Sequence, residues 1–210
     1  RFGDDTEDTF TGGAQTDHLY GAAGDDTLDG ADGDDHLEGN SGADELKGGN
    51  GQDTLLGGLG DDTLDGGADN DFLKGGTGTD IYEFHSGDGQ DTILDPDIAG
   101  EIKVDGLTLT GGRETATGSG VWQGEGAQQD FRYTLANESD GRRTLIILAG
   151  RDRLFLKDYT VGKFGIELAD AGPLAAVEND IVGETSFILN RPGEFFSRFL
   201  RPRVVLYSGN

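Results

Sequence analysis

Cysteine and methionine are both absent from this chain of 210 residues, and only 33% of the residues are hydrophobic. Without cysteine the chain can form neither disulfides nor a thiolate metal site. It contains no apolar run near the roughly 18 residues that a membrane span needs, and no basic and apolar leader marks a cleavable signal peptide. Because Met is missing and the chain begins inside an irregular repeat, we expect it to be a fragment of a longer protein.

Basic residues are also scarce, since 16 Lys and Arg stand against 41 Asp and Glu, for a net charge of −25. The imbalance is concentrated in residues 1–95, which hold 25 acidic and 3 basic residues. Such a polyanion repels nucleic acid and anionic membranes, and its self-repulsion opposes folding. We therefore expect no nucleic-acid partner, and we predict that this region needs cations to fold.

Glycine, with 38 residues, is abundant and follows a period of nine. Residues 21–65 read GAAGDDTLD, GADGDDHLE, GNSGADELK, GGNGQDTLL and GGLGDDTLD, each with Gly first and fourth, Asp sixth and Leu eighth. The same frame fits 3–20 and 66–83 without an insertion, and a tenth unit at 86–94 follows a two-residue insertion. The sixth position is always Asp: Asp8, Asp17, Asp26, Asp35, Asp44, Asp53, Asp62, Asp71, Asp80 and Asp91.

The apolar eighth position predicts a short strand of about three residues at positions 7 to 9, with position 8 facing inward and the Gly-rich residues before it forming a turn. So small a strand cannot bury its apolar side chain alone, so successive units must stack. With two strands per coil, repeats i and i+2 lie about 4.8 Å apart and the Asp residues form two ladders. The gaps between loops offer carboxylate and carbonyl oxygens, which suit Ca²⁺ with its roughly 6 to 8 oxygen ligands.

The pattern GGxGxDxUx resembles the RTX, or hemolysin-type, calcium-binding repeat. The resemblance implies an all-β chain with a right-handed parallel β-roll, in which Ca²⁺ lies between loops i and i+2. It implies that the lower loop contributes its Asp and the carbonyls of positions 2 and 4: Ala22, Gly24, Ala31, Gly33, Asn40, Gly42, Gly49, Gly51, Gly58 and Gly60. The upper loop would contribute its Asp and the carbonyls of positions 1 and 3: Gly39, Ser41, Gly48, Asn50, Gly57, Leu59, Gly66, Ala68, Gly75 and Thr77.

Three loops have a residue other than Gly at position 4, namely Thr6, Gln15 and Asp69, and these residues should resist a positive φ. Ten loops make eight stacked pairs, of which five have Gly at position 4 of the lower loop. We therefore expect about five to eight calcium ions. The alternative is a disordered acidic tract, which the strict period disfavours.

After Asp95-Pro96, which we interpret as a breaking turn, the Gly repeats stop. Short β-type runs and turn signals such as Gly111-Gly112 predict a small, mostly antiparallel β unit over 96–170, similar to the segment that follows the roll in RTX proteins. We expect it to cap the open end of the roll. The runs cover 102–109, 131–135, 144–148, 153–156 and 164–168, and the expected core residues are Trp122, Phe131, Tyr133, Phe155 and Tyr159.

The remaining side chains show no catalytic motif, so we predict no catalytic residues and no enzyme within this chain. His18 and His36 both occupy position 7 and should stack on the outer face of one sheet. Two imidazoles without a third ligand make a weak metal site, so we favour a solvent-facing ladder. His85, near the end of the repeats, shows no surroundings that suggest a role as a base.

Residues 171–210 form a tail that differs from both earlier regions, with a short helix expected over 194–200 and a strand over 204–207. In type I secreted RTX proteins the uncleaved export signal lies at the extreme C-terminus, so the resemblance implies that this tail is a candidate secretion signal. Whether Asn210 is the natural terminus stays open.

Taken with the repeats, the resemblance implies a module that folds on calcium binding outside a Gram-negative bacterium. Such a module supports type I secretion and folding of a larger effector, such as a toxin or hydrolase, whose active domain lies upstream. The expected partners are calcium and the type I secretion apparatus. The alternative is a calcium-stiffened structural or adhesive module of a bacterial surface protein.

Overall fold

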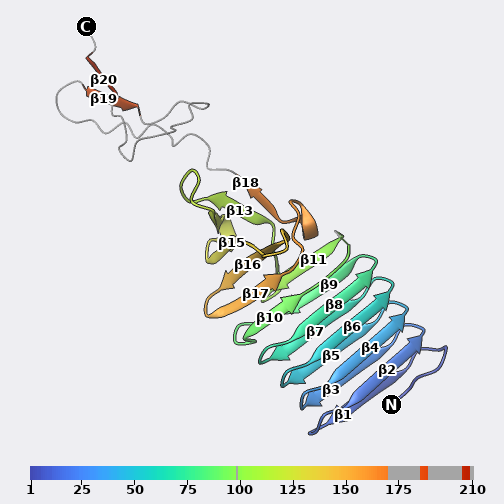
Figure 1. Ribbon diagram of the computed structural model, residues 1–210. Helices are drawn as coiled ribbons and strands as arrows, with labels where there is room; N and C mark the ends of the chain where they lie inside the picture. Colours follow the sequence, from blue (N-terminus) through green and yellow to red (C-terminus); the bar gives the residue numbers. More distant parts are fainter. Residues whose placement is uncertain (98, 170–184, 189–204, 209–210) are drawn as a thin grey trace. The chain divides into compact units, whose positions relative to one another are not determined.

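The computed structural model describes residues 1–97, 99–169, 185–188 and 205–208, and it is an all-β structure (Figure 1). The chain divides into two units, Arg1–Ala169 and Asp170–Asn210. In the second unit, β19 (Thr185–Ile188) pairs antiparallel with β20 (Val205–Ser208), close to the strand expected over 204–207. The helix expected over 194–200 lies outside the described residues. Within the described ranges, no helix is both long and apolar enough to cross a membrane.

Residues 1–95 form a parallel β-solenoid of about five turns, consistent with the expected β-roll. Each strand pairs with the strand two repeats away, so the odd and even strands build two sheets. The first sheet contains β1 (Thr9–Gly13), β3 (Thr27–Asp32), β5 (Glu45–Asn50), β7 (Thr63–Ala68) and β9 (Asp80–Phe84). The second contains β2 (His18–Ala23), β4 (His36–Ser41), β6 (Thr54–Leu59), β8 (Phe72–Thr77) and β10 (Gln90–Ile93).

The strands are longer than the sequence predicts. Most span six residues, from position 7 of one repeat to position 3 of the next, so the prediction of three-residue strands was wrong. The Gly at position 1 belongs to the strand and is needed for close approach rather than for turning. A Cβ added at Gly21 would lie 2.2 Å from Oδ2 of Asp26, so only Gly leaves room for the carboxylate.

The eighth positions form a continuous inner column, as predicted. These side chains stack across the two sheets and are shielded from solvent, except for the partly buried Phe10 in the first coil. The tenth unit joins this column despite its two-residue insertion, because Ile93 of β10 pairs with Leu73 of β8. The column consists of Leu19, Leu28, Leu37, Leu46, Leu55, Leu64, Leu73, Tyr82 and Ile93.

We call residues 96–169 the cap, because their strands cover the last strand of each roll sheet. In the first sheet β11 (Gly100–Val104) pairs parallel with β9 and is followed by β12 (Leu107–Thr108). In the second sheet β17 (Asp152–Leu156) pairs parallel with β10, and an antiparallel series leads away from it (Figure 1). The other cap elements are β13 (Gly111–Glu114), β14 (Val121–Gly124), η1 (Gly126–Gln128), β15 (Phe131–Asn137), β16 (Arg143–Ala149), η2 (Lys163–Gly165) and β18 (Glu167–Ala169).

Three expectations for the cap were wrong. Gly111-Gly112 is part of β13 rather than a turn, since Gly111 lies so close to β18 that a Cβ would sit 1.9 Å from the carbonyl oxygen of Glu167. The run 164–168 divides into η2 and β18, because Phe164 adopts a left-handed φ of 55°. Phe155 is only half-buried, since its neighbours Leu154 and Leu156 face the core. The other four expected core aromatics are buried.

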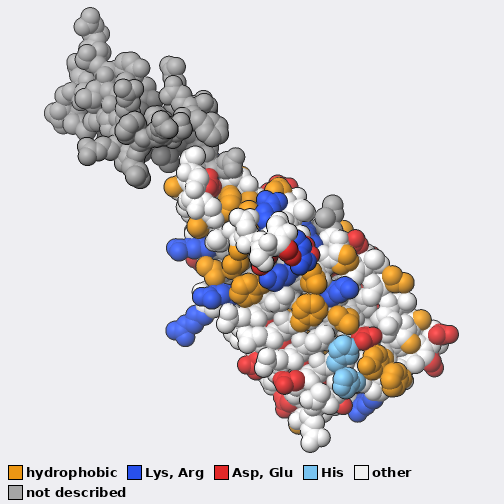
Figure 2. All heavy atoms as spheres, in the orientation of Figure 1, with side chains coloured by type: hydrophobic (Ala, Val, Ile, Leu, Met, Phe, Trp, Pro, Cys, Tyr) orange, Lys and Arg blue, Asp and Glu red, His pale blue; other side chains and the backbone are white. Residues whose placement is uncertain are grey.

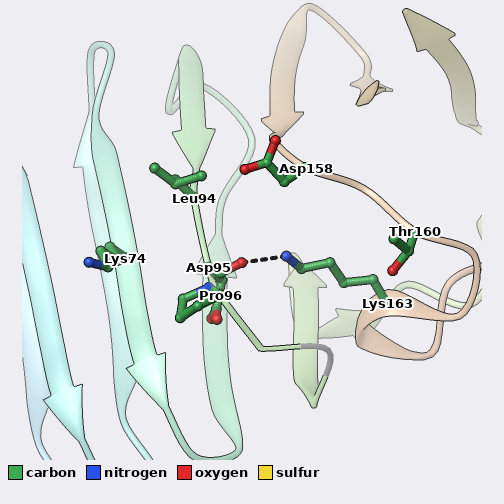
Figure 3. Close-up of a pocket in the computed structure, with 7 residues that line it drawn as sticks. All are labelled: Lys74, Leu94, Asp95, Pro96, Asp158, Thr160 and Lys163. Carbon is green, nitrogen blue, oxygen red and sulfur yellow. Dashed lines mark hydrogen bonds between the residues drawn. The ribbon is translucent and has the colours of Figure 1, made fainter. Parts of the chain in front are cut away.

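The junction between roll and cap is built around Asp95, which is buried. Tyr82 donates its hydroxyl hydrogen bond to Oδ2 of Asp95, and the backbone amide of Asp97 donates to Oδ1 at 2.8 Å. From the cap, the buried Lys163 donates from Nζ to the backbone oxygen of Asp95, beside a small pocket that Pro96 also lines (Figure 3). Asp95 therefore links a buried side chain of the roll, Tyr82, to a buried side chain of the cap, Lys163.

Candidate metal centre

The position 6 aspartates form two rows through the roll, one inside each set of turns. From Asp8 to Asp62, the backbone amide of each of these Asp residues donates to Oδ1 of the Asp 18 residues further on, at 2.7–3.0 Å. The amide of Asp71 reaches Oδ1 of Asp91 in the same way at 2.9 Å, across the two-residue insertion. From Asp26 onward, one oxygen of each carboxylate is thus fixed between two stacked loops.

The second oxygen of these carboxylates has no such partner. In eight of the aspartates, Oδ2 is shielded from solvent and accepts no hydrogen bond from the described residues. A buried carboxylate oxygen without a donor is unfavourable, so eight equivalent ones indicate a partner that the described part of the chain does not supply. The eight are Asp26, Asp35, Asp44, Asp53, Asp62, Asp71, Asp80 and Asp91.

Backbone carbonyls converge on the same places. The point where a Cβ of Gly21 would lie is 2.2 Å from Oδ2 of Asp26 and 2.8 Å from the carbonyl oxygen of Gly39 in the loop above. These two oxygens are therefore at most about 5 Å apart, and the arrangement recurs at Gly30, Gly48 and Gly57. The structure thus places a lower-loop carboxylate and an upper-loop position 1 carbonyl close together.

The lower-loop carbonyls of positions 2 and 4 face the loop above. A Cβ at Gly49 would lie 1.9 Å from the oxygen of Ala31, and one at Gly42 would lie 1.9 Å from the oxygen of Gly24. The position 3 carbonyls differ, because each accepts a hydrogen bond from the position 4 amide of the loop below, as Ser41 does from Gly24 at 2.9 Å. A carbonyl oxygen has a second lone pair, so this bond does not prevent it from acting as a ligand.

Burial raises the pKa values of several carboxylates in the two rows. Desolvation raises the pKa of Asp62 and of Asp71 to about 7, and that of Asp91 to about 8. Charged neighbours in the same row raise these pKa values further, whereas the backbone hydrogen bond to each carboxylate lowers them. Without a bound cation, several of these groups resist ionisation near neutral pH, and a divalent ion would reverse that preference.

The three loops without Gly at position 4 differ in the φ angle of that residue. At position 4, Asp69 adopts a positive φ of 85°, whereas Thr6 and Gln15 do not. The expected resistance therefore holds for the first two loops and not for the third. Sequence reasoning missed a second feature, the positive φ at position 2 in three early repeats, at Ala22, Ala31 and Asn40. The Gly residues at position 2 of later repeats were the available signal.

The residues present fit calcium. The donor set consists only of carboxylate and carbonyl oxygens, repeated at the spacing of stacked strands, which is the ligand chemistry of a hard divalent cation. The first two loops differ, because Asp8 and Asp17 are only partly buried. Figure 2 shows acidic side chains spread over the roll, while most of the visible Lys and Arg side chains lie over the cap.

A family model of the RTX calcium-binding nonapeptide repeat matches this chain in four copies, at residues 2–37, 29–64, 48–82 and 56–93. The region 2–93 therefore belongs to the RTX repeat family and is a calcium-binding module. RTX repeats are typical of secreted bacterial proteins and are structural rather than catalytic. No curated protein matches the chain.

The two position 7 histidines stack on the outer face of the second sheet, as expected. The rings of His18 and His36 have centroids 5.7 Å apart, and the ladder continues to Thr54 and Phe72. Nε2 of His36 already lies 2.6 Å from Oε1 of Glu38. This imidazole is therefore engaged with a carboxylate rather than directed at a shared metal position.

Proposed function

We propose that the ten Asp residues and the loop carbonyls that face them hold about five to eight calcium ions, and that the roll folds when these ions bind. The observation that carries the proposal is the set of eight buried Oδ2 atoms that accept no hydrogen bond from the residues that the structure describes. Each lower loop would supply its Asp and the carbonyls of positions 2 and 4, and each upper loop its Asp and the carbonyls of positions 1 and 3. The loops of Thr6 and Gln15 are the weakest sites.

Because calcium binds the folded roll and not the unfolded chain, its binding free energy adds to the free energy of folding. An ion between two loops also orders one of the two loops that form the next site in the row. Calcium binding is therefore cooperative along each row. In a calcium-poor cytosol the uncompensated carboxylates keep the chain unfolded. Outside the cell, where calcium is near millimolar, the roll forms and the cap closes its last turn.

We infer that this switch serves type I secretion of a larger effector, such as a toxin or hydrolase, from a Gram-negative bacterium. An unfolded chain suits passage through a narrow exporter, and folding outside the cell retains the product there. In this proposal residues 1–95 act as the calcium-dependent roll, 96–170 as the cap and 171–210 as the secretion signal. The effector activity belongs to a domain upstream of these repeats.

Small-angle scattering and equilibrium dialysis test the calcium step together. In excess chelator we expect a radius of gyration approaching the roughly 50 Å of an unfolded chain of this length, and in millimolar calcium a value much closer to the roughly 17 Å of a compact one. Dialysis should count about five to eight ions. A chain that is equally compact in chelator would contradict the proposal, and fewer than five ions would contradict the site assignment.

Export is tested separately. The chain is fused behind a reporter and expressed with a type I secretion apparatus, with and without residues 171–210. We expect truncation to abolish export while the calcium-dependent folding of the purified chain is unchanged. Undiminished export of the truncated fusion would refute the role of the tail and leave the calcium proposal standing.

A further inference from the structure

A group of ligand-type side chains lies near the end of the roll, outside the two Asp rows. Asp65 is on β7, and His85 and Asp88 lie in the turn that follows β9. Their candidate ligand atoms lie within 4.8 Å of one another. Nδ1 of His85 is 3.9 Å from Oδ1 of Asp65 and 3.8 Å from Oδ2 of Asp88. The group joins residues far apart in sequence because β7 and β9 pair directly.

Asp65 is the incompletely satisfied member of the group. Its Oδ1 is shielded from solvent and accepts no hydrogen bond within the described part of the chain, although the side chain as a whole is 21% exposed. The His85 ring nitrogen is beyond hydrogen-bond distance from it. The other charged groups that act on Asp65 are Lys47 on β5 and Glu83 on β9. The surroundings therefore hold one ammonium group and an excess of carboxylates.

The turn that carries His85 and Asp88 is held from two sides. Internally, the amide of Asp88 donates to the backbone oxygen of His85 at 3.1 Å, and the amide of His85 donates to Oδ2 of Asp88. The cap holds Ser86 and Gly87, which lie between His85 and Asp88 in the chain. Asp105 accepts a hydrogen bond from the amide of Ser86 at 3.0 Å, and Asp152 accepts one from the amide of Gly87 at 2.8 Å. Such support holds prospective ligands in place before an ion arrives.

We propose that Asp65, His85 and Asp88 bind one borderline divalent transition-metal ion, of which Zn²⁺ is the representative, separately from the calcium rows. An imidazole nitrogen with two carboxylate oxygens suits Zn²⁺ and its neighbours, with water completing the coordination, whereas Ca²⁺ prefers oxygen ligands alone. Bonds of about 2.0–2.2 Å require the three atoms to approach by about 1 Å. Rotation of the His85 side chain, which is 56% exposed, supplies this movement. The ion fastens the turn at 85–88 to β7, where roll and cap meet.

The test uses the full chain in saturating calcium, so that the roll is folded before zinc is added. Calorimetric titration should show one Zn²⁺ per chain, and Co²⁺ in its place should give an absorption spectrum with nitrogen and oxygen ligands. His85→Ala should weaken zinc binding about tenfold or more, and Asp65→Asn should weaken it as well. The matched control is the double variant His18→Ala/His36→Ala, which removes the other two histidines and should bind zinc as the wild type does.

Circular dichroism in calcium without zinc separates this proposal from the calcium proposal, because it reports roll folding alone. If His85→Ala does not fold, the wild type is titrated with zinc and the NMR signals of its three imidazoles are followed. The signal of His85 should shift when zinc binds. The proposal is overturned if the calcium-loaded wild type binds no zinc, or if binding is lost in the double variant but not in His85→Ala. It is equally overturned if calcium displaces zinc with similar affinity.

Discussion

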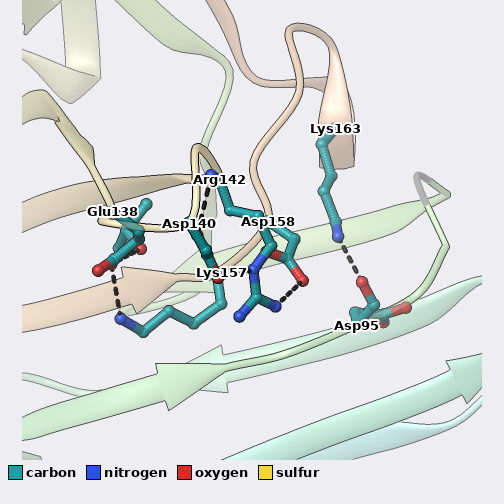
Figure 4. A network of polar contacts seen from close by, with 8 residues as sticks. Asp95, Glu138, Asp140, Arg142, Lys157, Asp158 and Lys163 are labelled. Carbon is teal, nitrogen blue, oxygen red and sulfur yellow. Dashed lines mark hydrogen bonds and ion pairs between the residues drawn. The ribbon is translucent and has the colours of Figure 1, made fainter.

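The roll and the cap differ in how their charged side chains are compensated. In the roll, eight carboxylates are buried with an oxygen that accepts no hydrogen bond from the described residues. In the cap, a surface network pairs Arg142 with Asp140 at 2.7 Å and with Asp158 at 3.1 Å, and Lys157 with Glu138 at 3.1 Å (Figure 4). The cap therefore supplies its own counter-charges, whereas the roll depends on ions from outside.

The two regions also bury apolar surface differently. From β2 to β8, each roll strand contributes one large side chain to the inner column, and the next inward position is a Gly that leaves room for an Asp. The cap contributes larger and more varied side chains, including Trp122 and Tyr133, to the same continuous core. With so little apolar surface per residue, the roll cannot offset the burial of its carboxylates by the hydrophobic effect alone. The difference explains why the roll depends on calcium to fold.

The largest effect of a single substitution should come from the middle of an Asp row. Asp44 accepts from the amide of Asp26 and donates its own amide to Asp62, so it borders two gaps. Asp44→Ala should raise the calcium concentration at the folding midpoint about tenfold or more, since two sites lose a ligand. The matched variant is Asp8→Ala, at the exposed end of the same row. Equal midpoints for the two variants in a calcium titration would argue against shared ligands.

The next largest effect should be the pH dependence of the stability of the roll in the absence of calcium. Burial raises the pKa of Asp53 and Asp80 to about 6, of Asp62 and Asp71 to about 7 and of Asp91 to about 8, above the roughly 3.9 of an unfolded Asp. The folded roll then binds more protons than the unfolded chain between about pH 4 and 8, so its stability rises as the pH falls through this window.

In chelator, the β-content measured by circular dichroism should therefore be higher at pH 5 than at pH 8. In calcium the dependence should reverse, because protons compete with the ions for the same carboxylates. A chelated chain with the same spectrum at both pH values would contradict the assignment of the perturbed groups to the folded roll.

A smaller effect is expected where the cap is attached. Lys163→Ala removes the donor to the backbone oxygen of Asp95 and leaves a buried carbonyl without it, at a cost of about 1–3 kcal/mol in the free energy of unfolding. Denaturation in calcium, followed through the fluorescence of Trp122, measures this change in the cap. The control is Lys157→Ala, which loses an ion pair with Glu138 at the surface and should therefore change the free energy of unfolding much less than Lys163→Ala does.

The smallest effect should be a gain in stability. Ala31 adopts a positive φ of 78°, a conformation that Gly takes without strain, so Ala31→Gly should stabilise the calcium-loaded roll by up to about 1 kcal/mol. Ala43, also in a roll turn, is not among the positive-φ residues, and Ala43→Gly should destabilise by a similar amount. Urea unfolding in saturating calcium compares the two, and a shared sign would refute the backbone explanation.

The sequence predicts the roll well because a fixed period of nine converts position in the chain into position in space. That argument yields the two Asp rows, the inner column and the pairing of repeats i and i+2. It does not reveal why position 1 must be Gly, because the clash with Asp26 at Gly21 appears only once the strands are built. Nor does the period reveal the positive φ at Ala22, because Ala, unlike the Gly at the same position of later repeats, does not signal a left-handed backbone.

Aperiodic regions gave poorer predictions for a physical reason. Strands β13 and β14 lie in Gly-rich or irregular sequence and are defined by partners across the cap. The parallel pairing of β17 with β10 joins segments about 60 residues apart, which local pattern does not encode. The group of Asp65, His85 and Asp88 likewise depends on the insertion before the tenth unit, which places the turn beside β7.

The most direct test of calcium-dependent folding is the far-UV circular dichroism spectrum of the full chain at neutral pH, recorded in excess chelator and then at increasing calcium. Because eight buried carboxylates each keep an oxygen that accepts no hydrogen bond from the described residues, the spectrum in chelator should lack the β-signature of the roll, which should appear cooperatively as calcium approaches millimolar. A chain that is equally rich in β-structure in chelator and in calcium would contradict this account.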